Sequence, residues 1–215
     1  GFEAYWEIPG DEETAVNGKW VPGPGADFLS ALRDALGELP IIAEDLGVIT
    51  PGVEKLRDDF ELPGMKVLQI AWSAPKNPFL PHNHVENAVV YSGTHDNNTT
   101  VGWWLDEVDH GTRSFMQTYL EREIDEINWR FIQIGMASVG HTFIMTLQDV
   151  LGLGSKHRMN TPGKPGGNWQ WRFTSQMLEE AHGDRLKHLT WLYQRRSDQQ
   201  EQAVGDAAER ETETS

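Results

Sequence analysis

Four runs of consecutive apolar residues recur along the chain, and each is about as long as one β-strand. A strand with one face in water alternates apolar and polar residues, whereas these runs are almost continuously apolar. Continuous runs are typical of parallel strands that are covered on both faces. We therefore expect buried strands at residues 39–46, 65–72, 88–93 and 142–147.

Amphipathic helical patterns lie between these runs. One pattern stops at Gly37, a residue type that commonly follows the last turn of a helix. Thr50 followed by Pro51 is typical of a helix N-terminus, where Thr caps and Pro occupies the first turn. Helices are thus expected at residues 26–36, from Pro51 onward, at 112–138 and at 176–196.

Strands that alternate with helices predict an α/β architecture with a parallel sheet. Four β–α units are half of the eight that close a (β/α)8 barrel. The chain is therefore expected to be either a small open sheet or the second half of such a barrel. The run at 142–147 could also continue the helical pattern of residues 132–139.

Charge and composition exclude several kinds of partner. The 215 residues carry a net charge of −15, which argues against nucleic acid and against an anionic membrane surface. There is no cysteine, so neither disulfides nor thiolate chemistry is expected, and a cytoplasmic location fits. No apolar run is long enough to cross a membrane. Residues 198–215 contain six Asp or Glu and are expected to form a disordered acidic tail.

Three of the four expected strands end in polar residues: Glu44-Asp45, His95-Asp96-Asn97 and Gln148-Asp149. The C-terminal ends of barrel strands lie at one face, where reactive groups gather, so we expect an acidic rim there. An Asp after a strand often caps the next helix instead, and for Asp45 we favour such a structural or helix-start role. Glu44 is the better candidate for chemistry, because Glu is a poorer cap.

An acidic rim suits two kinds of chemistry. Paired carboxylates can cleave glycosidic bonds, one as proton donor and one stabilising an oxocarbenium-like transition state. Alternatively, His82-Asn83-His84 and His95-Asp96 could hold a metal ion. The nine tryptophans favour sugars, because several lie in expected loops beside polar residues and offer flat amphipathic faces.

Several segments resemble signatures of the 4-α-glucanotransferases, which are the amylomaltases or disproportionating enzymes of glycoside hydrolase family 77. The matching segments are LPIIAEDLGVITP at 39–51, PGMKVLQ at 63–69, VYSGTHDN at 90–97, QDVLGLG at 148–154, RMNTPG at 158–163 and NWQWR at 168–172. The resemblance covers residues 1–197. It implies that these residues form the second half of an α-amylase-type (β/α)8 barrel, strands 5–8 with their connecting helices, followed by the tail.

The resemblance implies transfer of α-1,4-glucan segments to an acceptor glucan or glucose by a retaining double displacement, without metal or cofactor. Glu44 matches the family's general acid/base, which protonates the glycosidic oxygen and then deprotonates the acceptor hydroxyl. Asp96 matches the carboxylate that binds donor-sugar hydroxyls and favours the charged transition state. Further substrate contacts are expected at His95, Asn97, Asp45, His82, Gln148, Arg158 and Asn160.

The family's aspartate nucleophile lies in an Arg-x-Asp-His-Phe-Arg motif, which these 215 residues do not contain. We therefore expect the chain to be the back part of a longer enzyme and to be inactive by itself. Two positions depart from the family pattern: Asn98, where relatives usually have Asp, and His84, where they often have Tyr. A non-catalytic glucan-binding fragment and a metal-dependent barrel hydrolase remain as alternatives.

Overall fold

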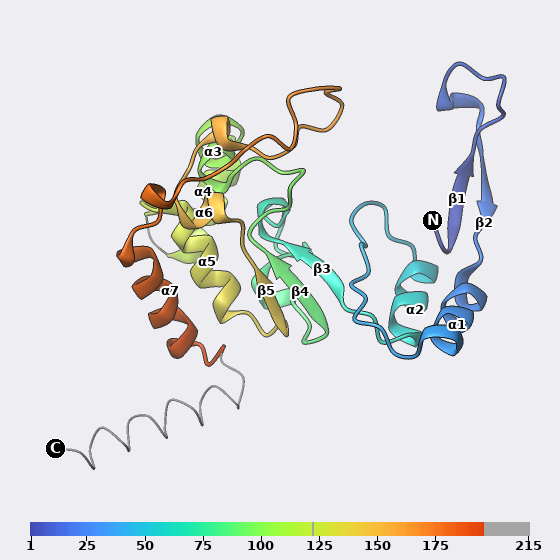
Figure 1. The fold of residues 1–215 in the computed structure, drawn as a ribbon, viewed down its shortest axis with the longest axis horizontal. Coiled ribbons are helices and arrows are strands. Elements are labelled where there is room, and N and C mark those ends of the chain that lie inside the picture. Colours follow the sequence, from blue (N-terminus) through green and yellow to red (C-terminus); the bar gives the residue numbers. More distant parts are fainter. Residues whose placement is uncertain (122, 196–215) are drawn as a thin grey trace, which may run out of the picture. The chain divides into compact units, whose positions relative to one another are not determined.

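A computed structural model describes residues 1–121 and 123–195 of the chain (Figure 1). The chain divides into two compact units. Unit 1 contains residues 1–66, 85–89 and 140–142, and unit 2 contains residues 67–84, 90–139 and the described residues from Phe143 onward. The expected acidic tail at 198–215 lies outside the described residues.

Short strands and helices are interspersed along the chain, which confirms a mixed α/β architecture. The strands are β1 (Ala4–Glu7), β2 (Lys19–Pro22), β3 (Gly64–Val67), β4 (Ala88–Tyr91) and β5 (Thr142–Ile144). The helices are α1 (Gly25–Leu36), α2 (Pro51–Asp59), α3 (Thr100–Asp106), α4 (His110–Leu120), α5 (Ile127–Ala137), α6 (Leu147–Val150) and α7 (Glu180–Leu192). β1 pairs with β2, and β3, β4 and β5 form a three-stranded sheet in that order.

Unit 1 begins with an antiparallel hairpin that the sequence patterns do not predict. Trp6 of β1 lies opposite Trp20 of β2, with the rings 5.4 Å apart in an edge-to-face arrangement. The next pair, Glu7 and Lys19, forms an ion pair of 3.1 Å. Its strands are only four residues long and mostly exposed, so no apolar run marks them.

The end of α1 and the start of α2 lie where the sequence signals predict them. α1 ends at Gly37, whose φ of 75° lies in the left-handed region that glycine adopts without strain. At the start of α2, the Thr50 hydroxyl accepts a hydrogen bond from the Val53 N–H at 3.3 Å, and Pro51 is the first helical residue. Both signals are local, which is why sequence alone places these ends.

The predicted strand at 39–46 is wrong, because this segment is irregular in the structure. The Ala43 N–H donates to the Pro63 carbonyl at 2.9 Å, but Pro63 has no N–H to return. Pro40 lacks a donor as well. A strand needs a ladder of such bonds along a neighbour, and apolar character alone does not supply one.

The other three apolar runs do form strands, each shorter than the run itself. The run at 65–72 leaves the sheet after Val67 and continues as a 3₁₀ turn over Leu68–Ile70. In the last run, Thr146 caps α6 by accepting the Asp149 N–H. Gln148 and Asp149 therefore lie within a short helix, which corrects their expected place at a strand end.

The helical pattern at 112–138 forms two helices, α4 and α5. α4 ends at Glu121, whose φ of 52° is left-handed. α7 lies within the pattern predicted at 176–196, whereas α3 follows a Thr-rich stretch with no amphipathic pattern. Over the residues that the structure describes, no helix is long and apolar enough to span a membrane.

Unit 2 contains a hydrophobic core built around α5. Figure 1 shows α5 in its centre, and it contacts α3, α6 and α7. Trp72 and Trp104 are buried in this core, so two of the tryptophans considered for sugar binding serve as core residues instead. Other core side chains are Leu68, Leu80, Val90, Met116, Ile127 and Phe131.

Candidate active site

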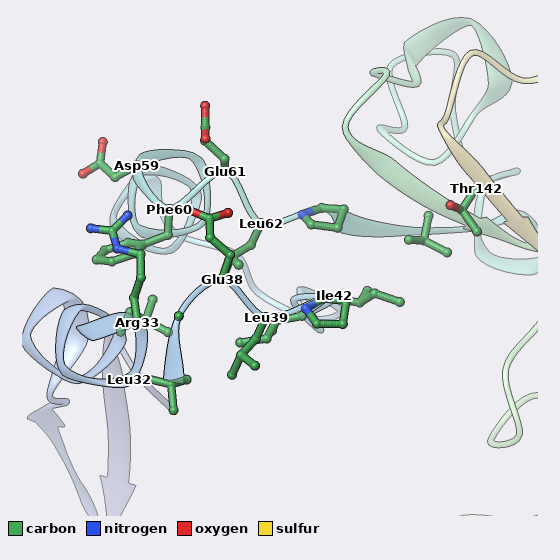
Figure 2. Close-up of a pocket in the computed structure, with 16 residues that line it drawn as sticks. Leu32, Arg33, Glu38, Leu39, Ile42, Asp59, Phe60, Glu61, Leu62 and Thr142 are labelled. Atoms are coloured by element: carbon green, nitrogen blue, oxygen red, sulfur yellow. The ribbon is translucent and has the colours of Figure 1, made fainter. Parts of the chain in front are cut away.

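Unit 1 has a cavity of about 490 Å³, shown in Figure 2, but it is not the predicted site. Its walls come from α1, from the segment after α1 and from the end of α2, and they are largely Leu, Ile, Pro and Phe side chains. At its rim, the Arg33 guanidinium lies 5.3 Å from the Phe60 ring. None of the predicted catalytic or substrate-binding residues lines it. The candidate site is therefore built from those residues themselves.

Glu44 and Asp45 in unit 1 are neighbours with opposite surroundings. Glu44 is exposed, and one of its carboxylate oxygens accepts the Leu46 N–H at 2.9 Å. Asp45 is buried, with 7% of its surface exposed. The exposed carboxylate is the one that can reach a ligand.

Asp45 is held by groups inside unit 1. Arg57 of α2 donates to its Oδ2 at 2.7 Å, and the Met65 N–H donates to its Oδ1 at 2.7 Å. Burial lowers the pKa of Arg57, but hydrogen bonds to Asp45 and Asp58 outweigh this, so the pKa is raised. Because Thr50 caps α2, Asp45 is not the helix-start residue, and its contacts are those of a structural residue.

In unit 2, the predicted residues around Asp96 do come together. Asn160 donates from its side-chain amide to Asp96 Oδ1, and Arg158 donates to the Asp96 backbone carbonyl at 2.6 Å. Arg158 also reaches Glu107, at 3.5 Å. Asp96 itself is half exposed, so one carboxylate is held in place while still open to solvent.

His95 lies between Asp96 and an aromatic side chain. Its Nε2 is 3.4 Å from Asp96 Oδ2. The His95 ring also contacts Trp169: the two ring centroids are 4.9 Å apart, and the angle between the ring planes is 41°. Trp169 is exposed, so this contact is at the surface rather than in the core. Its neighbour Trp171 instead donates its ring N–H to His157 at 3.0 Å.

A small pocket of about 20 Å³ lies beside these residues, enough for about one water molecule. Asn97 lines it, and its side-chain oxygen accepts from both the N–H and the hydroxyl of Thr94, which closes the turn after β4. Gln148 also lines it; its amide donates to the His157 carbonyl at 3.3 Å. His95 and Arg158 complete the set that the structure brings together here.

His82 is expected to contact substrate, but the structure places it at an exposed position of a 3₁₀ turn over Pro81–Asn83, and it does not line the pocket beside Asp96. Its ring nitrogens lie 2.9 Å from the Tyr119 hydroxyl and 3.0 Å from the Pro75 carbonyl. His84 is buried, with its ring nitrogens 2.7 Å from the Ser138 hydroxyl and 2.8 Å from the Phe79 carbonyl. Among residues 1–121 and 123–195, no three His, Asp or Glu side chains group closely enough to hold a metal ion.

Asn98 is one of the two positions expected to depart from the family pattern, and its contacts suit an amide. Its side-chain N–H2 donates to Glu107 at 2.8 Å and to the Ser155 hydroxyl at 2.9 Å. A carboxylate at this buried position would face the carboxylate of Glu107, and like charges at that distance repel. The amide thus fits a site that already contains an acidic partner.

Asp149, which belongs to the expected rim, is turned inward in unit 2. It is 1% exposed, and its two oxygens accept from the Ser92 hydroxyl at 2.6 Å and the Thr100 N–H at 2.7 Å. Burial raises the pKa of the Asp149 carboxyl, and these hydrogen bonds only partly offset that rise. Asp149 joins the turn after β4 to the start of α3 and α6.

The sequence includes Asp149 in the expected rim and Trp169 in an expected loop, but it does not predict what either side chain contacts. The buried role of Asp149 depends on Ser92 and Thr100, which are far from it in sequence. The contact of Trp169 with His95 likewise joins distant segments. The only local signal for Trp169 is its position among glycines and other aromatic residues, which indicates a loop but not what the ring touches.

Comparison with known proteins gives the family. A family model described as 4-alpha-glucanotransferase matches residues 1–178. The chain is 50% identical over 198 residues to the 4-alpha-glucanotransferase of Thermus thermophilus, covering 88% of this chain and 39% of that protein. It is 50% identical over 200 residues to that of a Synechocystis species, with 91% and 39% covered.

A solved structure agrees. The amylomaltase from Streptococcus agalactiae in complex with acarbose superposes with a TM-score of 0.84 at 37% identity. The matched region covers 90% of this chain and 39% of that one, so the chain spans about two fifths of the relatives that it matches. Since the family model covers most of its length, the chain belongs to the 4-alpha-glucanotransferase family.

Proposed function

We propose that this chain is part of a 4-alpha-glucanotransferase that moves α-1,4-glucan segments from a donor to an acceptor glucan or to glucose. The observation that carries the proposal is the cluster around Asp96, within a chain that shares half of its residues with named 4-alpha-glucanotransferases. An exposed carboxylate that is held by the Asn160 amide, with the His95 imidazole beside it and Arg158 on its backbone carbonyl, suits the hydroxyl groups of a sugar.

Glu44 is the proposed general acid/base. In the first step, the nucleophile's carboxylate forms a bond to the anomeric carbon of the donor. The glycosidic C–O bond breaks, and Glu44 gives its proton to the leaving oxygen. In the second step, an acceptor hydroxyl attacks that carbon as Glu44 takes the hydroxyl proton, which releases the nucleophile with overall retention. The exposure of Glu44 supports this role.

Asp96 is the proposed carboxylate that binds donor hydroxyls and stabilises positive charge near the anomeric carbon. Its contact with Asn160 supports a fixed orientation, which is what electrostatic stabilisation of a transition state requires. His95 would donate to or accept from the donor sugar, with Asn97, Gln148 and Arg158 nearby. Neither a metal nor a cofactor has a step in this scheme, and α-1,4-glucans are the expected substrates.

For the whole protein, we propose a (β/α)8 barrel in which residues 1–197 supply strands 5–8 and their helices. Support comes from the similarity to the amylomaltase structure. The same proposal includes a cytoplasmic location, which is based on the absence of cysteine. It includes neither a membrane nor a nucleic acid as a partner.

The experiment that tests this function is Glu44→Gln in the full-length protein, assayed by disproportionation of maltotriose. Gln keeps the shape but carries no transferable proton, so turnover should fall by about 10²–10⁴-fold. Glu38→Gln is the matched control, because Glu38 is also exposed and lies in the same connection after α1. It should leave turnover unchanged, and neither variant should lower the unfolding temperature. Near-normal turnover of Glu44→Gln would refute the acid/base role.

A further inference from the structure

One loop of unit 2 contacts the His95-Asp96 dipeptide at three points. From residues 158–169, Arg158 holds the Asp96 backbone carbonyl and Asn160 holds the Asp96 carboxylate. At the far end of the loop, the Trp169 ring packs against the His95 ring, with centroids 4.9 Å apart and the planes tilted by 41°. Two polar contacts thus fix Asp96, and an aromatic contact bears on His95.

The backbone at Trp169 is unusual. Its φ of 62° lies in the left-handed region, which bulky residues rarely occupy. Two hydrogen bonds keep it there: the Trp169 N–H donates to the Met159 carbonyl at 2.7 Å, and its carbonyl accepts from Arg172 at 3.1 Å. A glycine would adopt this conformation more readily, so backbone geometry does not explain a tryptophan at this position.

Burial does not explain it either. Trp169 is 54% exposed and belongs to neither hydrophobic cluster of unit 2. Its ring contacts the ring of His95 in a tilted arrangement, and the His95 side chain is itself 53% exposed. An exposed histidine side chain normally changes rotamer on the picosecond to nanosecond timescale. A ring packed against it limits that motion.

We propose that Trp169 is a positioning residue for His95. Its indole holds the imidazole in the orientation in which Nε2 faces Asp96 Oδ2, at 3.4 Å. When His95 is already ordered before the donor sugar binds, binding does not have to pay the conformational entropy of ordering its side chain. This inference rests on the proposed function, in which His95 binds the donor, and it adds that donor affinity depends on a residue that need not touch the sugar.

Three substitutions separate positioning from loop stability. Trp169→Gly removes the ring and relieves the left-handed backbone, so the unfolding temperature should stay the same or rise. Trp169→Phe retains an aromatic face. Trp191→Ala is the matched control, because Trp191 of α7 is also exposed, at 62%, and also lies against a histidine, His188, with ring centroids 5.9 Å apart.

The first readout is the NMR spectrum of the His95 ring protons in the full-length protein, which does not depend on turnover. The indole face should shift these resonances upfield of those of an exposed histidine. Trp169→Gly should move them to the exposed position, Trp169→Phe should retain part of the shift, and Trp191→Ala should leave them unchanged. Wild-type resonances in Trp169→Gly would overturn the proposal.

The second readout is donor affinity, measured as KM for maltotriose and as Kd for acarbose. Because an aromatic stack contributes modestly, Trp169→Gly should raise both constants by about three- to tenfold, with a smaller change in kcat. Trp169→Phe should restore most of the loss. Unchanged constants in Trp169→Gly, or an equal loss in Trp191→Ala, would overturn the inference. Absence of transfer by the wild-type protein would instead refute the proposed function, and the NMR shifts and acarbose affinity would still decide the role of Trp169.

Discussion

The carboxyl group of Asp149 is almost completely buried. A buried charge is costly unless it is well hydrogen-bonded, and Ser92 and Thr100 supply one donor to each oxygen. The raised pKa of Asp149 indicates that these two donors do not fully replace water. The side chain therefore links the turn after β4 to α3 and α6 at some cost in stability when it is ionised.

Asp149→Asn should stabilise the protein at neutral pH. The Asn oxygen can still accept from the Thr100 N–H, and its amide can donate to the Ser92 hydroxyl, with no charge to bury. Because the folded-state pKa of Asp149 lies above its unfolded value, the folded state binds this proton more tightly. The contribution of Asp149 to stability is therefore greatest below the unfolded pKa and is lost as pH rises to the folded pKa.

The measurement is the difference in unfolding temperature between Asp149→Asn and wild type as a function of pH. The difference should be small near pH 3 and should grow in favour of the variant towards pH 7, with roughly 2–4 °C for each kcal/mol. Other carboxyl groups titrate in both proteins, so they cancel in the difference. A variant that is less stable at pH 7 than at pH 3, relative to wild type, would show that the ionised form is preferred.

At the scale of elements, the start of β3 depends on the absence of a side chain. A Cβ added at Gly64 would lie 2.4 Å from Asp45 Oδ2 and 3.2 Å from Arg57 Cδ. The glycine thus allows β3 to approach the buried ion pair that joins α2 to the segment carrying Glu44. The sequence shows Gly64 next to a proline, where it reads as a turn signal, and gives no sign of this close approach.

Gly64→Ala should destabilise the protein by about 1–3 kcal/mol, because the added methyl must displace the Asp45–Arg57 pair. Gly183→Ala is the contrasting substitution. Gly183 lies within α7, a Cβ there meets nothing within 4 Å, and alanine in a helix interior should add about 0.5–1 kcal/mol. Chemical denaturation of both variants checks the two signs, and equal effects would contradict the steric explanation.

Across the whole molecule, the features that depend on interactions between residues close in sequence could be predicted from the sequence. The features that depend on a distant segment could not. Gly37 and the Thr50-Pro51 pair place helix ends because the signals act within one turn. The apolar run at 39–46 does not place a strand, because a strand also requires a bonded neighbour that the run cannot specify. Family motifs supplied the candidate residues, and the cluster of Asp96, Arg158 and Asn160 does form.

The activity of the isolated chain also depends on groups that these 215 residues do not contain. The family's nucleophile motif does not occur in these 215 residues, and the chain matches about 39% of the length of its relatives. Unit 1 also exposes Leu36, Leu39 and Ile42, by 62%, 41% and 43%, on and after α1. These apolar side chains are the kind that a closed barrel covers.

The purified 215-residue polypeptide should therefore not disproportionate maltotriose, whereas a full-length protein that contains it should. Without a nucleophile no covalent intermediate forms, and the roles proposed for Glu44 and Asp96 do not by themselves complete a retaining transfer. Chromatography of the products checks this: glucose and maltopentaose should accumulate with the full-length protein only. If the polypeptide alone produces both, the nucleophile lies within these residues and the proposed division of roles is wrong. Maltotriose binding without turnover would instead match a glucan-binding role for the isolated chain.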